Sequence, residues 1–158
     1  MRTSIHSLSL LLFALPALSI PYHICSPARD CIVSTGQEQP GHPVRTAHRH
    51  HDSHRYPPNT LVDVHAHVAG HHSTTGHVSG LSKSGLFIGR SRDGRHLIWV
   101  EEPFAHKWEF TPGAQRGFHV VQVPGHEEFW LDAGSDKPVE VVGPDHGDVY
   151  WTFDPILF

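Results

Sequence analysis

The 158-residue sequence lacks the residues and motifs that support several large classes of function. Its two cysteines are too few for an all-thiolate zinc site. It contains neither a Gly-x-Ser-x-Gly nucleophile motif nor a phosphate-binding glycine loop. Its formal net charge is −4, and no basic patch with interleaved aromatic residues argues for a nucleic-acid partner. These absences favour a protein that is not an enzyme, requires no cofactor and binds no nucleic acid.

Long apolar segments are also scarce, and the one such run lies at the N-terminus. Arg2 precedes the apolar run Leu8–Leu15, and Ala17-Leu18-Ser19 follows it as a small-x-small cleavage site. This order is typical of a secretory signal peptide over residues 1–19, cleaved before Ile20. The alternative is a membrane anchor, but the run is shorter than the roughly 20 residues that span a bilayer. We therefore expect a secreted, extracellular protein without a membrane partner after cleavage.

The two cysteines, Cys25 and Cys31, lie six residues apart near the start of the expected mature chain. Secreted proteins fold in an oxidising compartment, which favours a disulfide between them. Because the closed loop is short, the stabilisation is expected at the low end of the usual range. We predict that this bond holds a local turn and not the core.

Residues 20–74 are rich in histidine and proline and poor in apolar side chains. Such a composition buries too little surface to offset the entropy of ordering, so we predict a mostly disordered region with a small disulfide loop. Neutral imidazole is a good ligand for zinc and copper, and two runs could supply several nitrogens to one ion. The alternatives are a pH-responsive tail and a solvated low-complexity linker. The candidate metal ligands are His48, His50, His51, His54, His65, His67, His71 and His72.

From Thr75 to Phe158, short apolar runs alternate with turn residues, the pattern of an all-β domain. No window in this region predicts an amphipathic helix. Asp93-Gly94 between two β-type runs predicts a tight hairpin. The predicted strands are His77–Val78, Leu86–Gly89, His96–Val100, Lys107–Thr111, Gly117–Val123, Glu128–Leu131, Val139–Val142 and Val149–Phe153.

The same domain contains a repeated frame, Trp-x-Phe-x-Pro, at Trp108 and at Trp151. The two tryptophans are 43 residues apart, and the flanking β-type runs keep this offset without a gap. A period of this size indicates one supersecondary unit used more than once. We expect both tryptophans to occupy equivalent core positions.

Several short segments carry a resemblance to a known family. In chain order they are Thr75-Gly76-His77-Val78, Leu86-Phe87-Ile88-Gly89-Arg90, Trp108-Glu109-Phe110, Gly117-Phe118-His119-Val120-Val121 and Trp151-Thr152-Phe153. Over about half of the chain, this order resembles the cospin-type serine protease inhibitors of mushrooms. The resemblance implies a β-trefoil fold and a non-enzymatic inhibitor of an extracellular protease.

A trefoil has three repeats, whereas residues 75–158 show two. The fold class predicted is therefore all-β, an incomplete β-trefoil-like domain or a small β-barrel. At the offset of 43, Trp108 falls on His65, which is no core anchor, so the third repeat is not expected upstream. Three explanations stay open: truncation, another β fold, or a homodimer that completes the barrel.

If the resemblance holds, function lies in a loop on a rigid scaffold. The candidate protease-binding loop contains Arg90, Arg92, Asp93, Gly94 and Arg95. An arginine at a protruding tip could enter the acidic specificity pocket of a trypsin-like protease, because guanidinium matches a carboxylate bidentately. The alternative is a solvated hairpin turn.

Three functional hypotheses follow from the sequence. The first is a secreted binding module that acts as a serine protease inhibitor. The second is a secreted histidine-rich protein that binds zinc or copper. The third is a diverged or truncated remnant without activity. The Gln-x-Trp signature of trefoil lectins is absent at both tryptophans, so the sequence predicts no sugar site.

Overall fold

The computed structural model describes residues 19–34, 36, 38–49, 55–66, 68, 72–81, 84–147 and 149–156. Over these ranges the chain is all-β, which confirms the predicted fold class, and every strand predicted after Thr75 is present. The helix found there, η1 (Glu102–Phe104), is a single 3-10 turn, and no described helix could cross a membrane. The strands are β1 (Ile20–Cys25), β2 (Asp30–Val33), β3 (Arg45–His48), β4 (Leu61–His65), β5 (Thr74–Gly80), β6 (Phe87–Arg90), β7 (Leu97–Val100), β8 (Trp108–Pro112), β9 (Phe118–Gln122), β10 (Phe129–Leu131), β11 (Glu140–Val142) and β12 (Tyr150–Pro155).

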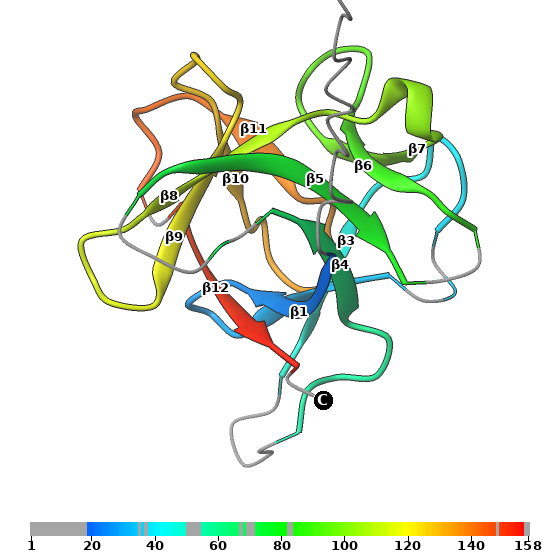
Figure 1. Cartoon of the computed structure of the whole chain (residues 1–158), viewed down its shortest axis with the longest axis horizontal. Helices are drawn as coiled ribbons and strands as arrows, with labels where there is room; N and C mark the ends of the chain where they lie inside the picture. The colour runs from blue at the N-terminus through cyan, green and yellow to red at the C-terminus, as the bar shows by residue number, and fades with distance from the viewer. Residues whose placement is uncertain are drawn as a thin grey trace, which may run out of the picture.

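Six of the strands close into a barrel. Strand β1 pairs with β4, β4 with β5, β5 with β8, β8 with β9, β9 with β12, and β12 again with β1. Every pair in this ring is antiparallel, and Figure 1 shows the first strand, in blue, beside the last, in red. A closed ring leaves none of these strands with an open edge, the usual starting point for aggregation.

The other six strands form three hairpins, β2–β3, β6–β7 and β10–β11. The hairpins meet in a cycle of backbone hydrogen bonds that reveals a threefold arrangement. The amide of Val44 donates to the carbonyl of Leu97 (2.9 Å), that of Leu97 to Val139 (3.0 Å), and that of Val139 back to Val44 (2.9 Å). All three side chains are fully buried. The chain therefore contains three four-stranded repeats, each supplying two barrel strands and one hairpin.

The first repeat corrects the prediction that residues 20–74 are mostly disordered. Four strands, β1 to β4, lie in this region, so that prediction is wrong for the residues described. Its few apolar side chains alternate along the strands, and Ile24, Ile32, Val62 and Val64 are all completely buried. Ile24, for example, lies opposite Phe153 of the third repeat, so the composition of residues 20–74 alone underestimates their burial. Because the chain supplies its own third repeat, closing the barrel requires no second copy.

Tryptophan is replaced by valine in the first repeat. Val64, Phe110 and Phe153 stand at equivalent positions, because they pair with Val78, Val121 and Ile24 in the corresponding strands. Two residues earlier stand Val62, Trp108 and Trp151, all fully buried. Val62 precedes Trp108 by 46 residues and not by 43, which is why the sequence offset pointed to His65.

The prediction that Trp108 and Trp151 are equivalent core residues is confirmed. The indole N–H of Trp108 donates to the carbonyl of Ile88 (3.2 Å), and that of Trp151 donates to the carbonyl of Trp130 (3.1 Å). The two acceptors are 42 residues apart, so the hairpins are offset by one residue less than the barrel strands. Trp130 lies edge-on to both indoles, with ring centroids 5.0 and 6.2 Å away. The barrel interior is thus a packed aromatic core.

Candidate functional site

The loop between β6 and β7 is held by a dense set of local hydrogen bonds. The amide of Ser91 donates to the carbonyl of His96, and the amide of Gly94 donates to the carbonyl of Ser91, both at 2.9 Å. The carboxylate of Asp93 accepts from the Ser91 hydroxyl (2.6 Å) and from the Arg95 amide (3.1 Å). Gly94 has a φ of 74°, the left-handed conformation that glycine adopts without steric cost. The predicted hairpin is therefore present, and its turn is rigid.

Electrostatics favour the ionised form of Asp93 in this turn. The hydrogen bond from the Ser91 hydroxyl, followed by that from the Arg95 amide, lowers the pKa of Asp93 below its ordinary value. Both donors bond to the same oxygen, Oδ1, and an ionised carboxylate is the stronger acceptor. Ionised Asp93 therefore stabilises the turn through two charge-assisted hydrogen bonds.

The side chain of Arg90 fixes the position of the loop. Its Nε donates to the carbonyl of Gly94 (2.8 Å), while its two terminal nitrogens donate to the carboxylate of Glu128 at 2.9 and 2.5 Å. The same contact lowers the pKa of Glu128. Bidentate pairs of this kind fix geometry as well as adding energy. The guanidinium of Arg90 is thus engaged within the molecule, although the sequence analysis placed it among the residues offered to a partner.

Arg92 and Arg95 project from the tip of this loop. Both side chains are exposed, and neither forms an ion pair with any residue that the structure describes. Arg92 also lines an open depression of about 450 Å³, together with Ile98 and two prolines, Pro43 and Pro138. A partner that receives the guanidinium of Arg92 would also contact this mainly apolar floor. Of the three arginines in the predicted loop, Arg90 therefore forms contacts within the protein, whereas Arg92 and Arg95 are accessible to a partner.

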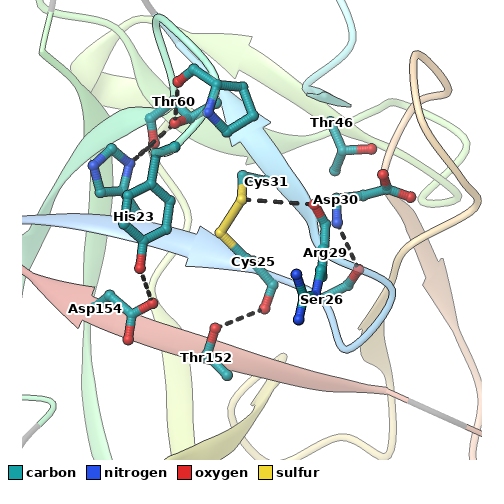
Figure 2. The surroundings of a disulfide bond; sticks show 12 residues. His23, Cys25, Ser26, Arg29, Asp30, Cys31, Thr46, Thr60, Thr152 and Asp154 are labelled. Atoms are coloured by element: carbon teal, nitrogen blue, oxygen red, sulfur yellow. Dashed lines mark hydrogen bonds between the residues drawn. A yellow bond between two sulfur atoms is a disulfide. The ribbon is translucent and has the colours of Figure 1, made fainter. Parts of the chain in front are cut away.

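The predicted disulfide between Cys25 and Cys31 is confirmed (Figure 2). It joins the end of β1 to the start of β2, and the two cysteines are partners in the β-ladder. Both are buried, and the bond closes the short turn between β1 and β2, as predicted. The hydroxyl of Thr152 donates to the carbonyl of Cys25 (3.2 Å), and Ser26 donates to Asp132 (2.5 Å). The turn that it closes therefore joins the first repeat to the third.

Three of the eight predicted metal ligands lie in the described ranges. His48 Nδ1 is 2.9 Å from the carboxylate of Asp30, His65 Nε2 is 2.7 Å from the Ser79 hydroxyl, and His72 is exposed. Within the described part of the chain, no three His, Cys, Asp or Glu residues are placed to hold one ion. The remaining predicted ligands lie outside the described residues: His50, His51, His54, His67 and His71.

Two other histidines pack into the wall of the barrel. His23 stacks on the ring of Tyr56 with centroids 3.8 Å apart, and its Nδ1 lies 3.0 Å from the hydroxyl of Thr60. His119 packs against the ring of Phe153, 5.3 Å away. Burial is the largest influence on both rings, and it lowers the pKa of each below 6.5. Folding therefore favours the neutral form of these two imidazoles.

Stability should consequently fall on mild acidification. A histidine whose pKa is lower in the folded than in the unfolded state contributes its full stability above the ordinary pKa of 6.5. This contribution is lost as the pH falls through 6.5 toward the folded-state pKa. Burial raises the pKa of Asp30 above its ordinary value of 3.8. Protonation of Asp30 therefore favours the folded state as the pH falls, which opposes the effect of the histidines. We expect the thermal midpoint to decrease from pH 7 toward pH 5.5, and to decrease less in His119→Gln. A decline equally reduced in His126→Gln, an exposed control, would contradict this assignment.

Comparison with known proteins supports the fold and little else. No protein-family model and no curated protein matches the sequence. Among solved structures, a ricin B-like lectin of Macrolepiota procera, determined in complex with lactose, superposes with a TM-score of 0.59 at 18% identity. The match covers 85% of this chain and 94% of the lectin.

Three repeats, a six-stranded barrel and a cap of three hairpins define a β-trefoil, and this chain is a β-trefoil protein. At this identity the likeness shows the fold alone, and the specific resemblance to cospin-type inhibitors stays a hypothesis.

Proposed function

We propose that this β-trefoil is a non-enzymatic binding protein that inhibits a trypsin-like extracellular serine protease through the loop Ser91–His96. The observation that carries the proposal is the contrast within this loop. Its backbone is held by Asp93 and Arg90, whereas the guanidinium groups of Arg92 and Arg95 are exposed and unpaired among the described residues. The similar structure from Macrolepiota procera is a ricin B-like lectin in complex with lactose, which accords with a trefoil used for recognition.

The physical basis is preorganisation. A flexible loop loses conformational entropy when it binds, and a loop already fixed in the free protein avoids much of that cost. An arginine that leaves water for an acidic pocket forms charge-assisted, bidentate hydrogen bonds with a carboxylate. The apolar floor beside Arg92, formed in part by Ile98, would exclude water from the rim of such a contact.

An inhibition assay on the full mature chain tests the proposal. We expect inhibition of a trypsin-like protease at micromolar concentration or below. Arg92→Ala or Arg95→Ala should weaken it at least tenfold, a loss of about 1.4 kcal/mol or more. Arg92→Lys should keep much of the inhibition if Arg92 enters an acidic pocket, because the positive charge is retained.

Arg116→Ala is the matched control, since Arg116 is an exposed arginine on the β8–β9 turn. It removes one positive charge without touching the loop Ser91–His96. Absence of inhibition by the wild-type chain at micromolar concentration would refute the proposal. Equal losses in Arg92→Ala, Arg95→Ala and Arg116→Ala would also refute it, because net charge and not the loop would then be responsible.

A further inference from the structure

Two histidines from different repeats face each other on the outer wall of the barrel. Strands β4 and β5 pair so that His65 lies directly opposite His77, one position beyond the pair Val64 and Val78. Val64 and Val78 are completely buried inside the barrel. Because side chains alternate between the faces of a strand, His65 and His77 project outward as direct cross-strand neighbours. Such neighbours have Cβ atoms about 4.5–5.5 Å apart.

Each imidazole is already oriented through one of its nitrogens. His77 Nδ1 lies 3.0 Å from the carbonyl of His106. A carbonyl only accepts, so this nitrogen carries the proton and His77 Nε2 has a free lone pair. His65 Nε2 lies 2.7 Å from the hydroxyl of Ser79, which leaves Nδ1 as its second nitrogen. Metal-binding histidines are characteristically held by a partner on the other ring nitrogen in this way.

An aromatic ring and two carboxylates surround the pair. The ring of Phe87 lies against both imidazoles, with centroids 5.6 Å from His65 and 6.1 Å from His77. The carboxylates of Asp63 and Glu102 lie near enough to interact electrostatically with the ring of His65. A divalent cation bound between the two rings would be attracted to these carboxylates.

We propose that His65 and His77 form a two-histidine site for a divalent transition-metal ion such as zinc, copper or nickel. Imidazole nitrogen suits these ions, and water or a donor from a bound partner would complete the coordination. The site differs from the predicted histidine clusters because strand register, and not closeness in sequence, brings its two ligands together. It therefore exists only in the folded protein, and it is independent of the proposed inhibitory loop.

Metal-dependent stability distinguishes this site from the many other histidines of the chain. A ligand raises the unfolding midpoint only if it binds the folded state better than the unfolded state. Histidines in an unstructured run bind zinc equally in both states and produce no shift. We expect excess zinc chloride to raise the thermal midpoint of the full mature chain. His65→Gln and His77→Gln should each abolish the rise, while the exposed control His126→Gln should retain it.

Two results would overturn the proposal: no rise with the wild-type chain, or a rise that persists in either His65→Gln or His77→Gln. The near-ultraviolet signal of the four buried tryptophans verifies that each variant is folded. If a variant does not fold, nitrogen chemical shifts of the wild-type imidazoles give the answer. Zinc should shift His77 Nε2 and His65 Nδ1, and a titration that leaves both unchanged excludes the site.

Discussion

Trp108→Ala should lower the free energy of unfolding by about 3–5 kcal/mol, the usual range for removing a large buried aromatic side chain. Trp108 is completely buried, and its ring lies 5.0 Å from that of Trp130. The substitution also leaves the carbonyl of Ile88 without the indole N–H that it accepts. Urea denaturation followed by the circular dichroism of the β-sheet measures this loss.

Two further variants show whether the loss of stability in Trp108→Ala comes from removing a buried aromatic ring. Trp108→Phe keeps most of the apolar volume and removes the hydrogen bond to Ile88, so its cost should be clearly smaller. Phe104→Ala removes an aromatic ring that is 68% exposed on η1, and it should change stability by no more than about 0.5 kcal/mol. If Trp108→Ala and Phe104→Ala had similar effects, the packed aromatic core would not be a main source of stability.

Gly76→Ala is expected to destabilise the fold by about 1–3 kcal/mol, because there is no room for the added methyl group. A Cβ at this position would lie 2.4 Å from the carbonyl oxygen of His65 and 2.5 Å from the Cβ of Ala66. The nearest atom belongs to the backbone, so relief requires β4 and β5 to move apart. The same movement would displace His65 from His77, and zinc should then raise the midpoint less than in the wild-type chain.

Gly143→Ala is the matched control for this experiment. A Cβ at Gly143 meets no atom within 4 Å, and its φ lies outside the left-handed region. The substitution should be neutral or slightly stabilising, since alanine restricts the unfolded chain more than glycine does. Equal stability of Gly76→Ala and Gly143→Ala would show that the barrel wall adapts easily at β4 and β5.

The second and third repeats were predictable because local sequence and tertiary environment agree there. The Trp-x-Phe-x-Pro frames place Trp108 and Trp151 at equivalent buried positions, and turn residues separate the strands. The first repeat was missed because Val62 occupies the tryptophan position. In addition, the connection from β4 to β5 is three residues longer than that from β8 to β9, because Val78 follows Val64 by 14 positions (78 − 64) and Val121 follows Phe110 by 11 (121 − 110). Its burial depends on partners far along the chain, such as Phe153 opposite Ile24.

In the candidate sites, too, contacts between residues close in sequence were predictable and contacts between distant residues were not. Asp93-Gly94 predicted the hairpin turn because the hydrogen bonds that define it are local. The bracing role of Arg90 depends on Glu128, which is 38 residues away, and no local pattern indicates that contact. His77 was likewise overlooked as a partner of His65, because only the pairing of β4 with β5 brings the two rings together. Disulfide formation was predictable from spacing and compartment alone.

The closure of the barrel by β1 and β12 has a consequence for how the protein is made. On the ribosome, β1 is synthesised first, yet one of its edges has no partner until Tyr150–Pro155 has been translated. The cycle of Val44, Leu97 and Val139 likewise cannot close before the third hairpin exists. Folding to the native state is therefore delayed until nearly all of these residues have emerged. Contacts so distant in sequence also imply slow folding, during which the incomplete barrel depends on chaperones or dilution to avoid association.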